Sequence, residues 1–255
     1  MRKIILLIIT LLITSSYLFA SNTIYQAGTI TSLTSGIYSS NTSLKDLESK
    51  GQYGLGTIAG AKGEMIIFKD KAYLSDISGK AVPLNENITV PFADVFSFSK
   101  PQINSSYNNL TIPEITSIIK HKLYGDNYFY IIKISGKFSK IHARTIPPAK
   151  KGYTLSEWIA KNQKFHDLEN VDGTLIGIYS PKYLASIAVP GFHFHFITKD
   201  HSHVYHVYSF ESAQVNIQIE KINNFQFILP DTKEYQKATI DNFSHETISK
   251  MEEGK

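Results

Sequence analysis

Residues 191–210 constrain the fold more than any other part of the chain, because they place histidines at strand spacing among apolar residues. The segment reads GFHFHFITKDHSHVYHVYSF and holds five of the nine histidines of the chain. Successive side chains of a strand point to opposite faces of a sheet. His193 and His195 therefore share one face, and the neighbouring phenylalanines share the other. The spacing predicts a strand that carries two imidazoles on the same side.

A reverse turn is expected at residues 198–202, where the sequence becomes polar. If the chain folds back at the third and fourth residues of this turn, His206 lies opposite His195 and Tyr208 lies opposite His193. Three imidazoles then converge. Neutral imidazole is a common zinc ligand, and three histidines leave coordination positions open for water or substrate, as in catalytic sites. A structural zinc ion more often has four protein ligands.

Two other histidines, His201 and His203, compete for the same ion. They lie in or beside the turn, and His203 precedes His206 by three residues instead of two, so we place both outside the set of ligands. The simpler interpretation of the whole segment is a surface hairpin whose histidines contact solvent, because short motifs often match by chance. The third histidine in register favours the metal site. The chain has no cysteine, so nitrogen and oxygen atoms must hold any metal.

The same segment resembles the zinc motif of the alpha-acetolactate decarboxylases. The third histidine of the motif follows the second by eleven residues, and the resemblance is carried by Gly191, His193, His195, Phe196, Ile197, Asp200 and His206. The resemblance implies that the three histidines are the zinc ligands. The chain departs from the family pattern at Val204 and Tyr205, where the family usually has two glycines.

Two earlier segments and the C-terminal tail extend the resemblance in matching order. One segment includes Gly54, Gly56, Thr57, Gly63, Glu64 and Met65. In the family a glutamate of this segment reaches the metal centre, although the pattern alone indicates only a hairpin with an exposed Glu64. Arg144, before a Thr-Ile-Pro run, resembles the arginine that meets the substrate's carboxylate, which a guanidinium can bind bidentately. Glu252 matches a closing glutamate that folds back over the metal, with Glu253 one register away.

The resemblance implies a zinc enzyme that removes carbon dioxide from 2-acetolactate, 2-hydroxy-2-methyl-3-oxobutanoate, and forms acetoin. A small molecule is then the partner, and a homodimer is common in the resembled family. In this reading Arg144 orients the carboxylate or guides a proton. Glu64 and Glu252 complete the zinc coordination, position water or deliver a proton. The sequence does not divide these roles between the two glutamates.

Two other functions use the same histidines. A secreted zinc hydrolase would activate water with Glu64 as general base, but the chain lacks HExxH or a similar hydrolase signature. A zinc-binding protein without catalysis would need the histidines alone. Arg144 discriminates against the second alternative, because a protein that only binds zinc needs no arginine that recognises carboxylates near its metal.

Residues 1–20 predict a secretory signal peptide, because Arg2 and Lys3 precede a short apolar run that ends in smaller residues near Ala20. The apolar run is too short for a membrane span, so after removal of the signal we expect a secreted or periplasmic protein without membrane attachment. The net charge of +4 includes those two residues, and the other lysines are scattered. This distribution gives no support for nucleic-acid binding.

The mature chain is expected to have a predominantly β, α+β fold with two β-rich, sandwich-like or barrel-like halves and a few helices. The predicted halves are residues 21–150 and residues 151–255, joined by the proline-containing linker 147–152. The second half would be an antiparallel β domain that carries the metal site, with the tail folded over it. Helices are expected after Thr42 or Ser43, after Thr111 and after Thr154. The expected strands include 127–134, 136–145, 174–179, 185–189, 192–197, 204–210, 214–222 and 225–229, with two more within 21–39.

Overall fold

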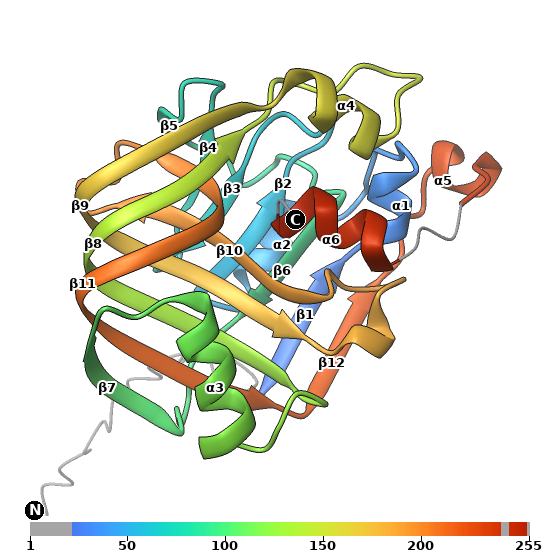
Figure 1. Ribbon diagram of the computed structural model, residues 1–255. Coiled ribbons are helices and arrows are strands. Elements are labelled where there is room, and N and C mark those ends of the chain that lie inside the picture. Colours follow the sequence, from blue (N-terminus) through green and yellow to red (C-terminus); the bar gives the residue numbers. More distant parts are fainter. Residues whose placement is uncertain (1–21, 241–244, 254–255) are drawn as a thin grey trace, which may run out of the picture.

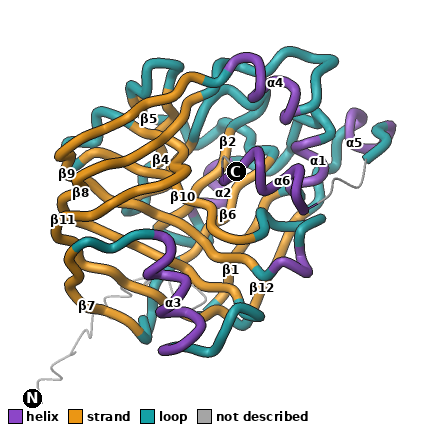
Figure 2. The backbone as a smooth tube through the Cα atoms, in the orientation of Figure 1, coloured by secondary structure: helices purple, strands orange, loops and turns teal. Residues whose placement is uncertain are grey.

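Strands make up most of the secondary structure in the computed structural model, which describes residues 22–240 and 245–253. The strands are β1 (Thr23–Ala27), β2 (Tyr53–Thr57), β3 (Met65–Phe68), β4 (Ala72–Ser75), β5 (Ala81–Pro83), β6 (Phe92–Phe96), β7 (Ile103–Asn108), β8 (Phe129–Thr145), β9 (Lys164–Ser180), β10 (Gly191–Thr198), β11 (Val204–Ile222) and β12 (Asn224–Ile228). The helices are α1 (Ile30–Thr34), α2 (Leu44–Glu48), α3 (Ile112–Lys122), α4 (Leu155–Asn162), the 3-10 helix η1 (Lys182–Leu184), α5 (Lys233–Lys237) and α6 (His245–Glu253). The expected α+β class with predominant β structure is confirmed (Figure 2).

Five strands form a strongly curved sheet with the order β10-β9-β8-β11-β7. Because β10 also pairs with β11, four of these strands close on themselves in the manner of a small barrel. Phenylalanines of β8, β10 and β11 fill its interior, which forms the largest apolar cluster of the described residues. Helix α3 lies beside this sheet (Figure 1), and its buried Ile115, Ile118 and Ile119 join the same cluster. The helix expected after Thr111 is therefore confirmed.

Seven strands form the second sheet, in the order β12-β1-β6-β2-β3-β4-β5. The pair β1 and β12 is parallel and the other neighbours are antiparallel. Leu55 of β2 and Ile66 of β3 share an apolar cluster with Ile131 of β8 and with Ile176 and Ile178 of β9. The two sheets therefore pack against each other. Burial of this apolar surface between the sheets is the main favourable contribution to folding.

The division of the sheets does not coincide with residue 150. Strands β7 and β8 precede that position but belong to the five-stranded sheet, whereas β12 follows it and lies in the seven-stranded sheet. The division of the chain into 21–150 and 151–255 stays a prediction about folding units. The predicted signal peptide, residues 1–20, lies outside the described residues. Among those described, no helix is both long and apolar enough to span a bilayer.

Several expected strands are different in the structure. Of the two strands expected within 21–39, on either side of a turn at Ser35 and Gly36, only β1 forms. Residues 30–34 are instead the helix α1, because Thr29 and Ser32 form a reciprocal capping box that starts it. The strand expected at 185–189 is absent. Its backbone instead follows η1, and the carbonyl of Ile187 accepts a hydrogen bond from the backbone N–H of Ile30 at 3.0 Å. This contact supplies a partner to an N-terminal amide of α1.

Candidate active site

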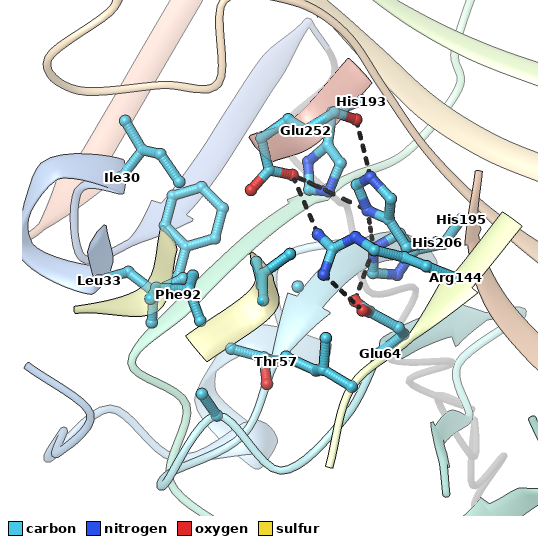
Figure 3. A pocket seen from close by; sticks show the side chains of 15 residues that line it. Ile30, Leu33, Thr57, Glu64, Phe92, Arg144, His193, His195, His206 and Glu252 are labelled. Atoms are coloured by element: carbon cyan, nitrogen blue, oxygen red, sulfur yellow. Dashed lines mark hydrogen bonds and ion pairs between the residues drawn. The ribbon is translucent and has the colours of Figure 1, made fainter. Parts of the chain in front are cut away.

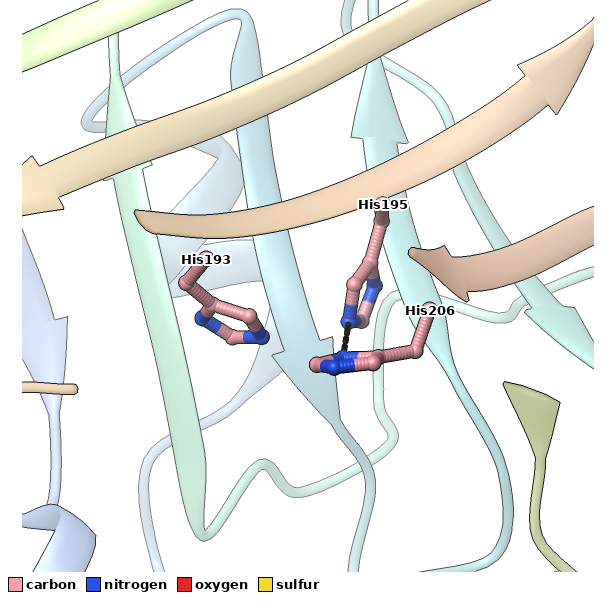
Figure 4. A group of neighbouring side chains, drawn as sticks. All are labelled: His193, His195 and His206. Atoms are coloured by element: carbon pink, nitrogen blue, oxygen red, sulfur yellow. Dashed lines mark hydrogen bonds between the residues drawn. The ribbon is translucent and has the colours of Figure 1, made fainter. Parts of the chain in front are cut away.

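Strands β10 and β11 bring three histidines together in the space between the two sheets (Figure 4). His193 and His195 are on β10 and His206 is on β11, and all three are buried. One ligand nitrogen from each lies within 4.8 Å of the others, which is close enough for one metal ion to bridge them. The predicted pairing of His195 with His206 is confirmed. The predicted pairing of His193 with Tyr208 is wrong, because the β10–β11 ladder ends at Phe194 and Val207.

Backbone carbonyls orient two of these imidazoles. Nδ1 of His195 lies 2.7 Å from the carbonyl oxygen of Met65, and Nε2 of His206 lies 2.8 Å from the carbonyl oxygen of Glu252. A carbonyl only accepts hydrogen bonds, so each of these nitrogens carries the proton. The remaining nitrogens, Nε2 of His195 and Nδ1 of His206, are 3.3 Å apart and face the centre of the group. Metal-binding histidines usually donate their outer N–H in this way.

Burial keeps the three imidazoles neutral. It lowers the pKa of His195 to about 3, and it lowers the pKa values of His193 and His206 well below their ordinary range. The positive charge of Arg144 lowers all three further. A neutral imidazole keeps the lone pair that a metal ion needs, so no proton would have to be removed before a metal ion binds at neutral pH.

Two glutamates and one arginine complete the group (Figure 3). Glu64 contributes an oxygen 3.5 Å from Nε2 of His195 and another 3.2 Å from Nη1 of Arg144. Glu252 contributes one oxygen that lies 3.6 Å from Nε2 of His193 and 3.9 Å from Nη2 of Arg144. Glu64, Arg144 and Glu252 are at most 5% exposed. The hairpin with an exposed Glu64 is therefore ruled out as a description of its segment, and Arg144 is buried as well.

The strands determine the position of Arg144. It is on β8 directly opposite His206 of β11, so the β8–β11 register places the guanidinium beside the histidines. The ring of Tyr208 lies 5.7 Å from the guanidinium carbon and supports it by a cation–π contact. Nε and Nη1 of Arg144 have no hydrogen-bond partner among the described residues. The guanidinium therefore keeps donors for a ligand.

The charges of the site suit a divalent cation. When both glutamates are ionised, two carboxylates against one guanidinium leave one net negative charge in a buried space, which is unfavourable without a compensating ion. Burial raises the pKa of Glu64, and Arg144 opposes this effect. A zinc ion would turn the excess into one positive charge, which a substrate carboxylate could neutralise. The buried Nδ1 of His193, which has no hydrogen-bond partner among the described residues, also fits a group with room for a further ligand. Nitrogen and carboxylate oxygen are both accepted by zinc.

The cavity at this group has a volume of about 30 Å³. Beside the charged residues, its wall consists of apolar side chains that the sequence did not identify, namely Ile30, Leu33, Phe92, Ile146, Leu155 and Ile159. Thr57 also lines the cavity, and its hydroxyl donates to the carbonyl of Gly63 at 2.8 Å. Apolar wall residues have no signature in a single sequence, whereas Thr57 belonged to a segment already noted for its glycines.

The two remaining histidines of the segment lie away from the site, as predicted. His201 packs edge-on against the rings of Phe68 and Tyr73. His203 stacks on Tyr205, and its Nδ1 contacts the hydroxyl of Ser202 at 2.7 Å. The turn between the strands is held by Asp200, whose carboxylate accepts hydrogen bonds from the side chains and backbone around it.

Comparison with known proteins identifies the family. The sequence model described as alpha-acetolactate decarboxylase matches residues 24–242. The chain is 35% identical to the alpha-acetolactate decarboxylase of Brevibacillus brevis over 90% of this chain and 78% of that protein, and 31% identical to that of Methanosarcina mazei over 91% and 81%. The crystal structure of alpha-acetolactate decarboxylase from Bacillus subtilis strain 168 superposes with a TM-score of 0.84 at 31% identity, covering 91% of this chain and 100% of that one. The chain therefore belongs to the alpha-acetolactate decarboxylase family.

Proposed function

We propose that this protein is a zinc-dependent enzyme that converts 2-acetolactate into acetoin and carbon dioxide. The observation that carries the proposal is the burial of Arg144, with two carboxylates, beside a group of three histidines that could hold a metal. The relatives named alpha-acetolactate decarboxylase support the reaction. The identity of the metal is inferred from the donor set of nitrogen and carboxylate oxygen.

The reaction breaks the bond between the carboxylate carbon of 2-acetolactate and its neighbouring carbon. The electron pair of that bond must be taken up by the adjacent ketone, which gives an enediolate, and a proton must then be added to the same carbon to give acetoin. Zinc, when bound by His193, His195 and His206, supplies a Lewis acid that favours negative charge on the ketone and hydroxyl oxygens. The other steps require groups that bind the carboxylate and supply the proton.

Arg144 is suited to hold the carboxylate end of the substrate. It is buried, it is fixed by the β8–β11 pairing, and it has donors without a hydrogen-bond partner among the described residues. A guanidinium in such a position can bind a carboxylate in one orientation and raise the share of substrate aligned for reaction. A protein that only binds zinc has no substrate carboxylate to hold, so it would not need Arg144.

Glu64 and Glu252 are the candidates for delivering the proton. They approach the histidine group from different elements, one from the segment before β3 and one from α6. Burial raises the pKa of Glu64, and a raised pKa favours a carboxyl group that must hold a proton near neutral pH. Glu252 and Glu64 could each also complete the coordination of the metal. The apolar wall around them keeps bulk water away from the carbanionic centre.

Zinc dependence can be tested on the mature protein with 2-acetolactate as substrate. We expect one zinc ion per chain, loss of acetoin formation after treatment with a chelator, and recovery when zinc is added. A metal-free protein that still forms acetoin at the original rate would remove zinc from the proposal. The hydrolase alternative would be supported instead if ester or amide substrates turned over in a zinc-dependent and Glu64-dependent manner.

A further inference from the structure

We infer that the backbone of α6 holds His206 in the tautomer that binds zinc, so that docking of this helix and retention of zinc depend on each other. The inference rests on the zinc site proposed above. It concerns the main chain of Glu252, which is a different group from the carboxylate already placed in the site.

The hydrogen bond from His206 to the carbonyl oxygen of Glu252 carries the inference. Its length is 2.8 Å, both groups are buried, and it assigns the proton of His206 to Nε2. Nδ1, which faces His195 at 3.3 Å, is then the nitrogen with a free lone pair. Without the carbonyl, the imidazole could rotate or place its proton on Nδ1. Either change reduces the fraction of molecules in which His206 is ready to bind a metal.

The corresponding partner of His195 is of a different kind. Nδ1 of His195 donates to the carbonyl of Met65, which is on β3 in the interior of the seven-stranded sheet. That carbonyl stays in place as long as the sheet is folded. The carbonyl used by His206 is near the end of the chain, on a helix of nine residues. The orientation of His195 is thus fixed by the folded sheet, whereas the orientation of His206 depends on the docking of α6.

Besides the carboxylate contacts of Glu252, buried apolar side chains and a tyrosine hydroxyl hold α6 in place. Ile248 is fully buried and Met251 is 5% exposed, and both join an apolar cluster with α1 and α4 that includes Ile30, Leu33, Leu155 and Ile159. The hydroxyl of Tyr208 lies 3.4 Å from the carbonyl oxygen of Met251 and 2.8 Å from Oε1 of Gln163. Two buried apolar side chains contribute only a few kcal/mol to the docking of the helix. Once the carboxylate contacts of Glu252 are also removed, α6 can separate without unfolding of the sheets.

Thermodynamic linkage makes the effect reciprocal. If a docked α6 strengthens zinc binding by some factor, then bound zinc strengthens the docking of α6 by the same factor. Removal of a hydrogen-bond partner of a metal-binding histidine typically lowers metal affinity by about 10-fold to 100-fold. This is the size of effect that we expect for loss of the Glu252 carbonyl.

The experiment must separate the carbonyl of Glu252 from its carboxylate. Zinc affinity is therefore measured by competition with a chelating dye in the full mature chain carrying Glu252→Gln, in which the carboxylate is already absent and the backbone is kept. Ile248→Asp is then added, because a carboxylate cannot remain in the apolar cluster and the helix must leave it. Glu246→Ala, on the exposed side of α6, is the matched control.

We expect Ile248→Asp to lower zinc affinity about 10-fold to 100-fold in the Glu252→Gln background, and Glu246→Ala to leave it unchanged. Hydrogen exchange should be fast in α6 of the Ile248→Asp variant and unaltered in the sheets. In the otherwise unchanged protein, zinc should slow exchange in α6, and nitrogen-15 spectra of labelled histidine should show zinc on Nδ1 of His206 with a proton on Nε2.

Unchanged zinc affinity in the presence of an undocked α6 would overturn the inference, as would equal exchange rates in α6 with and without zinc. Zinc on Nε2 of His206 would overturn it as well. A starting protein that binds no zinc at all would be a failure of the proposed function instead, because every comparison above begins from a zinc-loaded site.

Discussion

Arg144 is the residue that we propose binds the carboxylate of the substrate. It is 3% exposed, it lies between the carboxylates of Glu64 and Glu252, and its Nε and Nη1 have no hydrogen-bond partner among the described residues. Burial alone works to lower the pKa of a guanidinium, and the neighbouring Glu64, Tyr208 and Glu252 raise it again. Arg144 therefore stays charged in an enclosed site, where its contact with a carboxylate is little screened by solvent.

We expect Arg144→Ala to retain zinc and to lose most of its turnover of 2-acetolactate. The loss of a charge-assisted contact to a buried carboxylate costs about 1.5 to 3 kcal/mol, which corresponds to a reduction in rate of about tenfold to a hundredfold. Steady-state kinetics and metal analysis of the purified variant measure the two properties. Lys140→Ala, an exposed change on the same strand, is the control. Equal turnover of Arg144→Ala and the control would remove the assigned role.

Asp94 of β6 is a buried carboxyl group that the proposed reaction does not use. It lies opposite Gln26 on β1 and Leu55 on β2, and burial raises its pKa from 3.8 to about 8. In the folded state the group holds its proton in a range where the unfolded chain releases it. The stability associated with Asp94 is therefore fully present below pH 3.8 and is lost as the pH rises toward 8.

The variant Asp94→Asn tests this pH dependence, because asparagine has the shape of the protonated acid and no titration. The free energy of unfolding of the original protein should fall relative to that of the variant between pH 4 and pH 8, with a slope of up to about 1.4 kcal/mol per pH unit. Urea denaturation at a series of pH values measures the difference. Parallel curves for the two proteins would show that Asp94 is ionised in the folded state.

The histidine hairpin is the element whose structure the sequence predicted best. The alternation of side chains along a strand predicted that His193 and His195 share one face. The position of the polar turn predicted that His206 pairs with His195. The ladder ends sooner than expected because β11 leaves β10 and continues along β8. Pairing between strands far apart in sequence depends on the whole sheet, and a local pattern of alternation contains no information about it.

The long strands were predicted only in pieces. Strand β8 was expected as two segments, 127–134 and 136–145, whereas the strand runs without a break through Gly136. Gly136 has φ of +145°, and a Cβ there would lie 2.4 Å from the carbonyl oxygen of Gln214. The glycine permits close contact with β11 next to the register shift between Ser212 and Gln214. Similarly, the first half of β9 is exposed and polar, so only its pairing with β8 makes it a strand.

The metal-binding role of the hairpin can be tested by single replacements. We expect His193→Ala, His195→Ala and His206→Ala each to lose stoichiometric zinc, because each removes one of the three converging nitrogens. His201→Ala and His203→Ala should keep zinc, since these rings pack against aromatic side chains outside the group. Metal analysis after dialysis compares the five variants. Zinc retention in the first three, with loss in either of the last two, would contradict the assignment.

The whole molecule combines elements from both ends of the chain into one site. Glu64 comes from the segment just before β3 of the seven-stranded sheet, Arg144 and the histidines come from the five-stranded sheet, and Glu252 comes from α6. The catalytic roles of these residues were proposed from the resemblance, and the geometry brings all six together. The backbone carbonyls that orient His195 and His206 could not be predicted, because every residue has a carbonyl and only the fold decides which one is near.

A homodimer stays a prediction, and the mass of the mature protein in solution would decide it.

Export from the cytoplasm is a proposal for the whole chain, motivated by Arg2, Lys3 and the apolar run before Ala20. We expect the mature protein to begin near Ser21 and to be found in the periplasm or the medium. Mass spectrometry of the protein isolated from its native cell measures both the N-terminus and the compartment. An intact chain from Met1 to Lys255 in the cytoplasm would contradict the proposal.

Incubation of the zinc-loaded mature protein with racemic 2-acetolactate, followed by measurement of carbon dioxide and acetoin against an enzyme-free blank, tests the central claim most directly. The account predicts that both products appear in equal amounts and faster than in the blank. Acetolactate that stays intact in the presence of a fully zinc-loaded enzyme would contradict it. In that case membership of the family would reflect common ancestry without the activity.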